Sequence, residues 1–133
     1  MRNLKKWLLC WLAGFMACCA RGQVTVNASI DSVAIFIGQQ CCIDLKVTAP
    51  QQEKVTFPVF PQKVLTKGIE VLKEEIVSTE KINNGQQVST TKRYTITSFD
   101  SAMYYIPPFK VKAGNKEYQS KSLALKVETL DVD

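Results

Sequence analysis

The sequence predicts an all-β protein in which antiparallel strands form a sandwich. Hydrophobic and polar residues alternate in short runs, turn residues separate these runs, and no segment carries the period of a long helix. Alternation with a period of two is typical of strands that bury one face and expose the other. The chain has 133 residues, of which 46% are hydrophobic and 22% charged, so we expect one folded domain.

Residues 1–22 have the organisation of a signal peptide. Basic residues precede the apolar run at 7–17, and the small residues Ala20 and Gly22 suit a signal peptidase. The apolar run has about 11 residues, fewer than the roughly 20 that a membrane-spanning helix needs. We therefore expect a signal-peptide helix that is cleaved, and an exported mature domain at 23–133.

Lipoprotein processing at Cys18 is the alternative for this segment. Cys18 follows Phe15, Met16 and Ala17, and Phe15 stands where such sites usually carry an aliphatic residue. Lipidation would anchor the protein to a membrane, whereas simple cleavage would release it. Both readings predict a location in the periplasm or cell envelope.

The first runs of the mature chain alternate in hydrophobicity. Residues 24–26 open the series, and the run 33–37 continues to a turn at Gly38. In the run 41–47 the odd-numbered residues are hydrophobic and most even-numbered ones are polar. We therefore expect the odd-numbered side chains to face the core.

The next stretch is rich in proline. Pro50, Pro58 and Pro61 separate short apolar pieces at 55–57 and 59–60. Because proline cannot donate a backbone hydrogen bond, regular pairing should be poor here. We expect an edge segment or a loop that crosses between sheets.

The remaining sequence predicts two hairpins. Residues 69–82 and 88–99 flank Asn83-Asn84-Gly85, and asparagine and glycine tolerate the positive φ angles of tight turns. Residues 103–111 and 118–127 form the last pair around a further turn. The complete pattern has about seven strands, as expected of an immunoglobulin-like sandwich.

Asp100 and Tyr104 indicate a structural corner. Their spacing matches the corner that leads into the penultimate strand of many immunoglobulin-like domains, where a tyrosine hydroxyl bonds to the backbone. The alternative is that Tyr104 is a half-buried strand aromatic without this role.

Several runs of the sequence resemble one family of exported proteins. They are residues 94–109, Gly114, Tyr118, the terminal strand 122–127 and the start at 23–32 with Ile37-Gly38. Through them the chain resembles the N-terminal β-rich domain of BatD-like proteins of Bacteroidetes, which belong to aerotolerance systems. The resemblance implies an immunoglobulin-like domain that faces the periplasm and associates with envelope proteins, and it brings no defined site residues.

Proteins of this kind usually continue into a membrane helix. No apolar stretch long enough to span a bilayer lies between the last expected strand and Asp133. We expect either a shortened, soluble relative with the N-terminal domain alone or a truncated gene model.

Most of the net positive charge belongs to the signal segment. The chain carries 17 basic and 12 acidic residues, and four basic ones, Arg2, Lys5, Lys6 and Arg21, precede the mature domain. The mature domain therefore holds 13 basic and 12 acidic residues, well mixed along the chain. Because a phosphate backbone needs a clustered basic surface, we expect no nucleic-acid partner.

The residue types exclude several kinds of catalysis. The chain contains no histidine, which removes Ser-His-Asp and Cys-His mechanisms and imidazole metal sites. No glycine-rich phosphate loop precedes a helix. Glu74 and Glu75 would point to opposite faces of a strand, so they cannot act as an acid and base pair. We expect no catalytic residue, metal or cofactor.

Cys41 and Cys42 are the two cysteines of the mature domain. Neighbours on a strand project to opposite sides, so we expect one buried thiol and one exposed thiol rather than a bridge between them. In an oxidising compartment Cys42 is a candidate redox thiol that would pair with another chain or with a small thiol.

Aromatic residues near prolines provide a candidate interaction patch, namely Phe57, Phe60, Tyr105 and Phe109. The alternative is that these side chains pack in the core, since a small domain buries most of its aromatics. The predicted function is a non-enzymatic protein-interaction or assembly module that binds envelope proteins and meets a membrane only through a partner or lipidation.

The second predicted class is a secreted or surface-anchored module that binds a glycan or small ligand. Exposed aromatic and amide groups such as Tyr105, Gln86 and Gln87 would supply its site.

Overall fold

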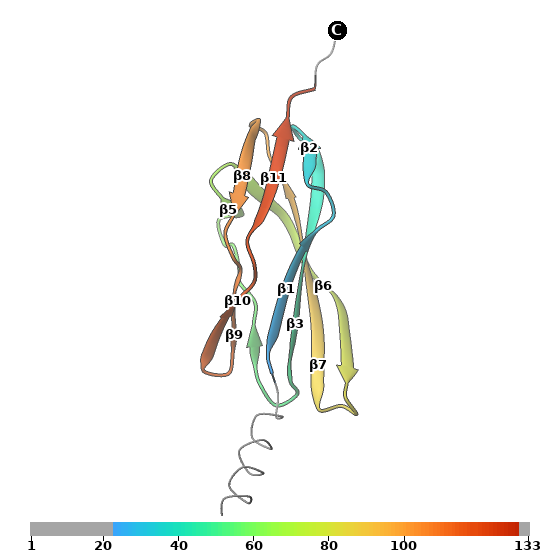
Figure 1. Ribbon diagram of the computed structural model, residues 1–133. Helices are drawn as coiled ribbons and strands as arrows, with labels where there is room; N and C mark the ends of the chain where they lie inside the picture. Colours follow the sequence, from blue (N-terminus) through green and yellow to red (C-terminus); the bar gives the residue numbers. More distant parts are fainter. Residues whose placement is uncertain (1–22, 131–133) are drawn as a thin grey trace, which may run out of the picture.

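The computed structural model describes residues 23–130, whose regular elements are all strands (Figure 1). No helix in this part of the chain is long and apolar enough to cross a membrane. The expected signal peptide at 1–22, with Cys18, lies outside the described residues. The strands are β1 (Thr25–Ile30), β2 (Ala34–Phe36), β3 (Gln40–Pro50), β4 (Val55–Thr56), β5 (Val64–Thr66), β6 (Ile69–Ile82), β7 (Gln87–Thr97), β8 (Ala102–Ile106), β9 (Lys110–Ala113), β10 (Lys116–Gln119) and β11 (Leu123–Glu128).

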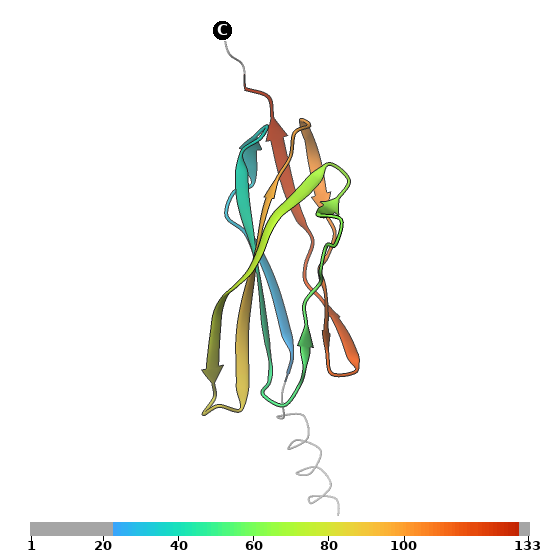
Figure 2. The same ribbon diagram turned by 180° about the vertical axis from the view of Figure 1, so that it is seen from behind.

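The strands form two facing layers (Figures 1 and 2). One layer is a five-stranded sheet in the order β1-β3-β7-β6-β5. The other consists of two short sheets, β2-β11-β8 and β10-β9-β4. The pairs are antiparallel except for β2 beside β11. This arrangement confirms the predicted all-β immunoglobulin-like sandwich.

The second layer divides where the chain loses its regular backbone pairing. Pro107 and Pro108 lack N–H groups and separate β8 from β9. Opposite them, Ser120 lies between β10 and β11. The Ser120 N–H donates to the carbonyl oxygen of Phe109 at 3.0 Å, and the Ser120 Oγ accepts from the Phe109 N–H at 2.9 Å. The expected strand 103–111 is therefore two strands, and the total exceeds the expected number.

The core lies between the two layers and is centred on β3 and β7. In β3 the odd-numbered residues 41–49 are buried, which confirms the predicted direction of their side chains. Leu45 and Tyr94 are fully buried. The other buried hydrophobic residues of the cluster are Ala28, Ile35, Cys41, Ile43, Val47, Ile69, Val71, Ile96, Ile106, Phe109, Val111, Leu125 and Val127.

The structure matches the sequence prediction at one hairpin and differs from it in the length of one strand. The hairpin of β6 and β7 turns at Asn83 and Asn84, whose φ angles are 52° and 58°, close to where the sequence placed it. The run 33–37 is shorter than expected, because β2 covers three residues. Only Ile35 of this run is buried, whereas Val33 and Ile37 are exposed.

Candidate functional site

Tyr104 forms the corner between β7 and β8. Its hydroxyl donates to the carbonyl oxygen of Asp100 at 2.8 Å and lies 3.1 Å from the hydroxyl of Ser98. The buried Ser98 hydroxyl also donates to the carbonyl oxygen of Gly68 at 2.7 Å. The corner therefore joins the start of β6 to the end of β7, and it is a structural feature rather than a binding site.

Of the four residues expected in an aromatic patch, Phe109 belongs to the core, and Phe57 and Phe60 are partly buried against it. Phe109 is 4% exposed and stacks on Tyr94, with their ring centroids 5.7 Å apart. Phe60 meets the edge of Tyr94 at 5.6 Å, and Phe57 also packs against the core. The four residues therefore do not form one exposed patch: Phe109 packs in the core, and Phe57 and Phe60 lie partly buried beside it.

Phe109 is buried while Tyr105 is exposed because the side-chain alternation changes at the two prolines between them. A continuous strand would place Tyr105 and Phe109 on the same face, because they are an even number of residues apart. Ile106 and Phe109 are instead both buried, so the interruption at 107–108 reverses the alternation. Tyr105 stays outside, with 64% of its surface exposed.

A shallow hollow lies beside this aromatic cluster. Its volume is about 190 Å³, below the roughly 300 Å³ that small-molecule pockets usually reach. Its lining residues are Pro58, Phe60, Leu65, Ile106, Pro107, Pro108, Phe109 and Lys110. The hollow is too small to define a ligand site.

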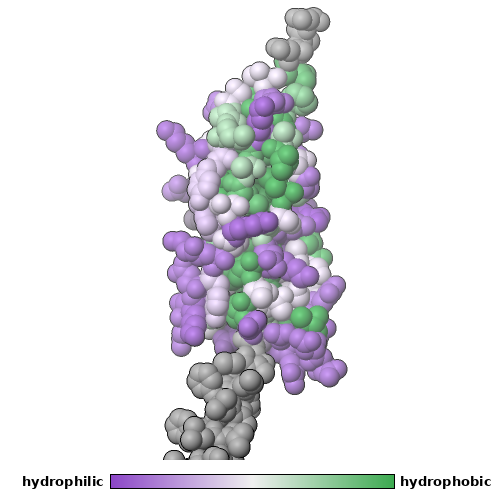
Figure 3. Space-filling model, viewed as in Figure 1, coloured by the Kyte–Doolittle hydropathy of each residue, from purple (hydrophilic) through white to green (hydrophobic). Residues whose placement is uncertain are grey.

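The outer side of the β2-β11-β8 sheet carries a group of exposed hydrophobic residues. Met103 and Tyr105 of β8 are 71% and 64% exposed, and Phe36 of β2 is 43% exposed. Figure 3 shows hydrophobic surface gathered over these strands. We define the apolar face by the outward-facing residues Ala34, Phe36, Met103, Tyr105 and Ala124.

Two charged residues lie within the apolar face. Lys126 and Glu128 occupy alternate outward positions on β11, and their side chains form an ion pair at 3.0 Å. Both side chains remain partly exposed, at 55% and 43%. The apolar face thus has one positive and one negative group on its central strand.

The hydrophobic surface continues to the end of the sandwich at which β11 finishes. Ile37, Phe99 and Leu130 are exposed there, at 37%, 62% and 62%. The Ile37 N–H donates to the Glu128 carbonyl oxygen at 3.0 Å, which fixes the turn after β2 beside the end of β11. These residues extend the hydrophobic area beyond the apolar face.

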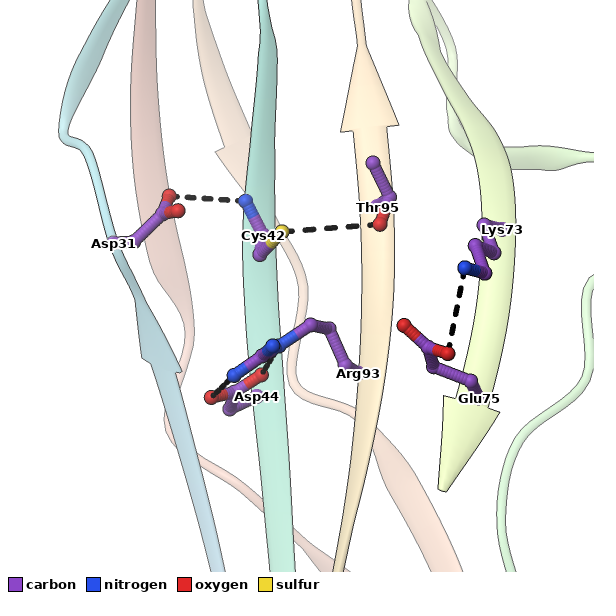
Figure 4. A network of polar contacts seen from close by, with 7 residues as sticks. All are labelled: Asp31, Cys42, Asp44, Lys73, Glu75, Arg93 and Thr95. Atoms are coloured by element: carbon purple, nitrogen blue, oxygen red, sulfur yellow. Dashed lines mark hydrogen bonds and ion pairs between the residues drawn. The ribbon is translucent and has the colours of Figure 1, made fainter. Parts of the chain in front are cut away.

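The outer side of the five-stranded sheet has a different character. Figure 4 shows its polar network, in which Arg93 donates to both carboxylate oxygens of Asp44, at 2.8 and 3.1 Å. Asp31 accepts a hydrogen bond from the Cys42 N–H at 2.9 Å. The pairing with Asp44 raises the pKa of Arg93 further, so this guanidinium stays charged. The centre of this outer side is therefore polar, whereas β6 at its edge exposes Leu72, Ile76 and Val77.

Cys41 and Cys42 project to opposite sides of β3. Cys41 is buried, and this burial raises the pKa of its thiol from 9.0 to about 12. Cys42 is half-buried, and its sulfur lies 3.8 Å from the Thr95 hydroxyl. The thiols do not form a bridge with each other, and a disulfide between Cys42 and another chain stays a prediction.

The amide groups expected to help in ligand binding lie far from Tyr105. Gln86 and Gln87 lie at the tip of the β6–β7 hairpin, at the opposite end of the sandwich from β8 (Figure 1). Gln87 accepts a hydrogen bond there from Asn83. Within residues 23–130 no group of three or more ligating side chains is placed to hold a metal ion.

The sequence contained a signal for the apolar face. Met103 and Tyr105 alternate with Tyr104 and Ile106, so both pairs of residues are visible in the strand pattern. The pattern alone did not tell which side of the strand would face solvent. Alternation in the run 33–37 already places Phe36 on the outer side, but the sequence gives no signal that β2 lies in the same sheet as β8.

Together these features define a class of protein, an immunoglobulin-like domain with an exposed apolar sheet face. The chain belongs to the BatD family, since the model described as "BatD DUF11 like domain" matches residues 28–127, from β1 to β11. Because BatD-family proteins are associated with the envelope, the chain is a cell-envelope protein module. No curated protein matched the sequence in a search.

Proposed function

We propose that this domain is a non-enzymatic protein-interaction or assembly module, exported to the periplasm, and that the apolar face binds its partner. The observation that carries the proposal is the grouping of Met103, Tyr105 and Phe36 on one side of one sheet. Large contiguous hydrophobic patches on soluble domains usually mark interaction sites.

The composition of the apolar face suits a protein partner. Aromatic residues and methionine are enriched in protein interfaces, and hydrophobic anchors near the centre contribute most of the binding energy. Tyr105 and Met103 provide such anchors on β8, and Phe36 provides one on β2. Lys126 and Glu128 offer charge complementarity, which governs the orientation of a partner more than its affinity.

The scaffold supports binding without rearrangement. β2 and β8 both pair with the central strand β11, and the inward side chains Ile35, Leu125 and Val127 are buried. The backbone under the exposed side chains is therefore held by the core. A preformed surface of this kind loses little conformational entropy on binding.

The same observations give little support to a glycan site. Tyr105 is exposed, but Gln86 and Gln87 lie at the other end of the sandwich and cannot contact the same small ligand. Small-ligand sites need a concave surface with converging polar groups. The proposal of a protein partner accounts for the apolar face better.

The test compares two substitutions in the protein expressed as the full chain. Met103→Asp places a charge in the apolar face, and Val59→Asp is the matched control, since Val59 is 69% exposed and lies on the loop after β4. Crosslinking in cells and mass spectrometry identify what is recovered with each variant. Loss of a specific envelope protein with Met103→Asp but not with Val59→Asp supports the proposal, and equal recovery contradicts it.

A further inference from the structure

We propose that the partner of the apolar face is a second copy of this chain, bound through a two-fold symmetric, face-to-face contact. This inference rests on the proposed function, because it names the partner of the same surface. The argument comes from the positions of charged, small and large residues across the β2-β11-β8 sheet.

The strand register places these residues in two neighbouring rows. Lys126 of β11 lies beside Ala34 of β2 in one row, and Glu128 lies beside Phe36 in the next. Met103 of β8 extends the first row on the other side of Lys126. Each row therefore differs from the next in both charge and side-chain size.

A two-fold axis lying between two facing sheets and perpendicular to β11 exchanges the rows. Lys126 of one copy then faces Glu128 of the other, and Ala34 faces Phe36, twice in each dimer. Sheets pack about 10 Å apart, a distance that a lysine and a glutamate side chain together span. The apolar face is thus complementary to itself in both charge and size.

Other arrangements of two copies lack this complementarity. If the axis ran along β11, Lys126 would face Lys126 and Glu128 would face Glu128, so like charges would meet on the central strand. An isologous interface needs a surface that is complementary to itself under its own symmetry operation. The register therefore selects the antiparallel arrangement of the two β11 strands.

The experiment measures self-association of the protein recovered from the envelope of cells that express the full chain. Sedimentation velocity with a reducing agent present, up to roughly 0.1 mM protein, should show a dimer that dissociates on dilution. Lys126→Glu should weaken the dimer roughly tenfold or more, because two attractive contacts become repulsive. Combining Lys126→Glu with Glu128→Lys should restore it, since the swapped charges are again complementary.

The control is Lys46→Glu, the same charge change at an exposed position on the outer side of β3. It should leave the dimer unchanged, and circular dichroism should show all variants folded. If Lys126→Glu does not weaken the dimer, the proposal that the two copies bind through the apolar face is overturned. Failure of the double variant to restore the dimer would overturn the antiparallel arrangement.

The remaining outcomes separate this inference from the proposed function. The protein could be monomeric at every concentration and still lose a different envelope protein with Met103→Asp. That result would overturn the proposal that the partner is a second copy, and it would support the proposed interaction module. A monomer with no partner affected by Met103→Asp overturns both.

Discussion

The ring of Tyr104 packs directly against the backbone of Gly68. A Cβ atom added to Gly68 would lie 2.5 Å from Tyr104 Cε1 and 2.8 Å from its hydroxyl oxygen. Gly68 also has a φ of 92°, in the region that favours glycine. The corner between β7 and β8 therefore depends on the absence of a side chain at this position.

Gly68→Ala should destabilise the domain by about 2–4 kcal/mol, through backbone strain and the clash with Tyr104. Gly85→Ala is the control, because Gly85 has a φ of 81° but no atom within 4 Å of an added Cβ. Gly85→Ala should lower the free energy of unfolding by about 1 kcal/mol, from backbone strain alone. Urea unfolding measures both values, and equal losses would contradict the role of the Tyr104 contact.

Tyr104→Phe isolates the hydroxyl of the corner. The variant keeps the ring against Gly68 but removes the hydrogen bond to the Asp100 carbonyl oxygen. The free energy of unfolding should fall by about 1 kcal/mol, the usual contribution of one such bond. If denaturant unfolding shows no change, the hydroxyl does not stabilise the corner.

Phe109→Ala and Tyr105→Ala distinguish the core from the apolar face. Phe109 is 4% exposed and stacked on Tyr94, so its truncation should cost about 3–5 kcal/mol. Tyr105 is 64% exposed, and its truncation should change stability by less than about 0.5 kcal/mol. A large loss of stability with Tyr105→Ala would mean that its role is structural.

The two thiols should differ in reactivity. In the folded protein at pH 8, iodoacetamide should modify Cys42 and spare Cys41, which is buried with a pKa of about 12. Peptide mass spectrometry, with and without denaturant, measures the extent of modification at each cysteine. Modification of Cys41 in the folded state would contradict its burial, and a non-reducing gel tests for an intermolecular disulfide through Cys42.

The raised pKa of Cys41 also affects stability at high pH. The unfolded thiol ionises near its ordinary value of 9.0, whereas the folded thiol stays protonated to about 12. The contribution to stability is therefore complete below pH 9 and is lost as the pH rises towards 12. Cys41→Val should reduce the fall in unfolding free energy just above pH 9, and an unchanged slope would count against this cause.

Much of the fold follows from local sequence patterns. The alternation in 41–47 predicted which side of β3 is buried, and Asn83-Asn84-Gly85 predicted the β6–β7 turn. Both depend on neighbouring residues alone, through the pleat of a strand and the φ preference of the turn. The contact between Tyr104 and Asp100 is likewise local, and its spacing was visible.

The composition of the apolar face depends on features of the fold that local sequence patterns do not determine. The sequence groups Phe109 with Tyr105 because both are aromatic residues beside Pro107 and Pro108, within one expected strand. The lack of N–H groups in these prolines breaks the strand, and the alternation resumes in the opposite sense. Phe36 joins Met103 on one face only because β2 and β8 pair with opposite edges of β11, which is a property of the tertiary fold.

The most direct test of the central claim is site-specific crosslinking in living cells. A photoreactive amino acid is placed at Tyr105 on the apolar face and, separately, at Thr95 on the outer side of the five-stranded sheet. Our account predicts a discrete protein adduct from position 105 and none from position 95. An adduct from position 95 alone, or none from position 105, would contradict the claim that the apolar face binds a protein partner.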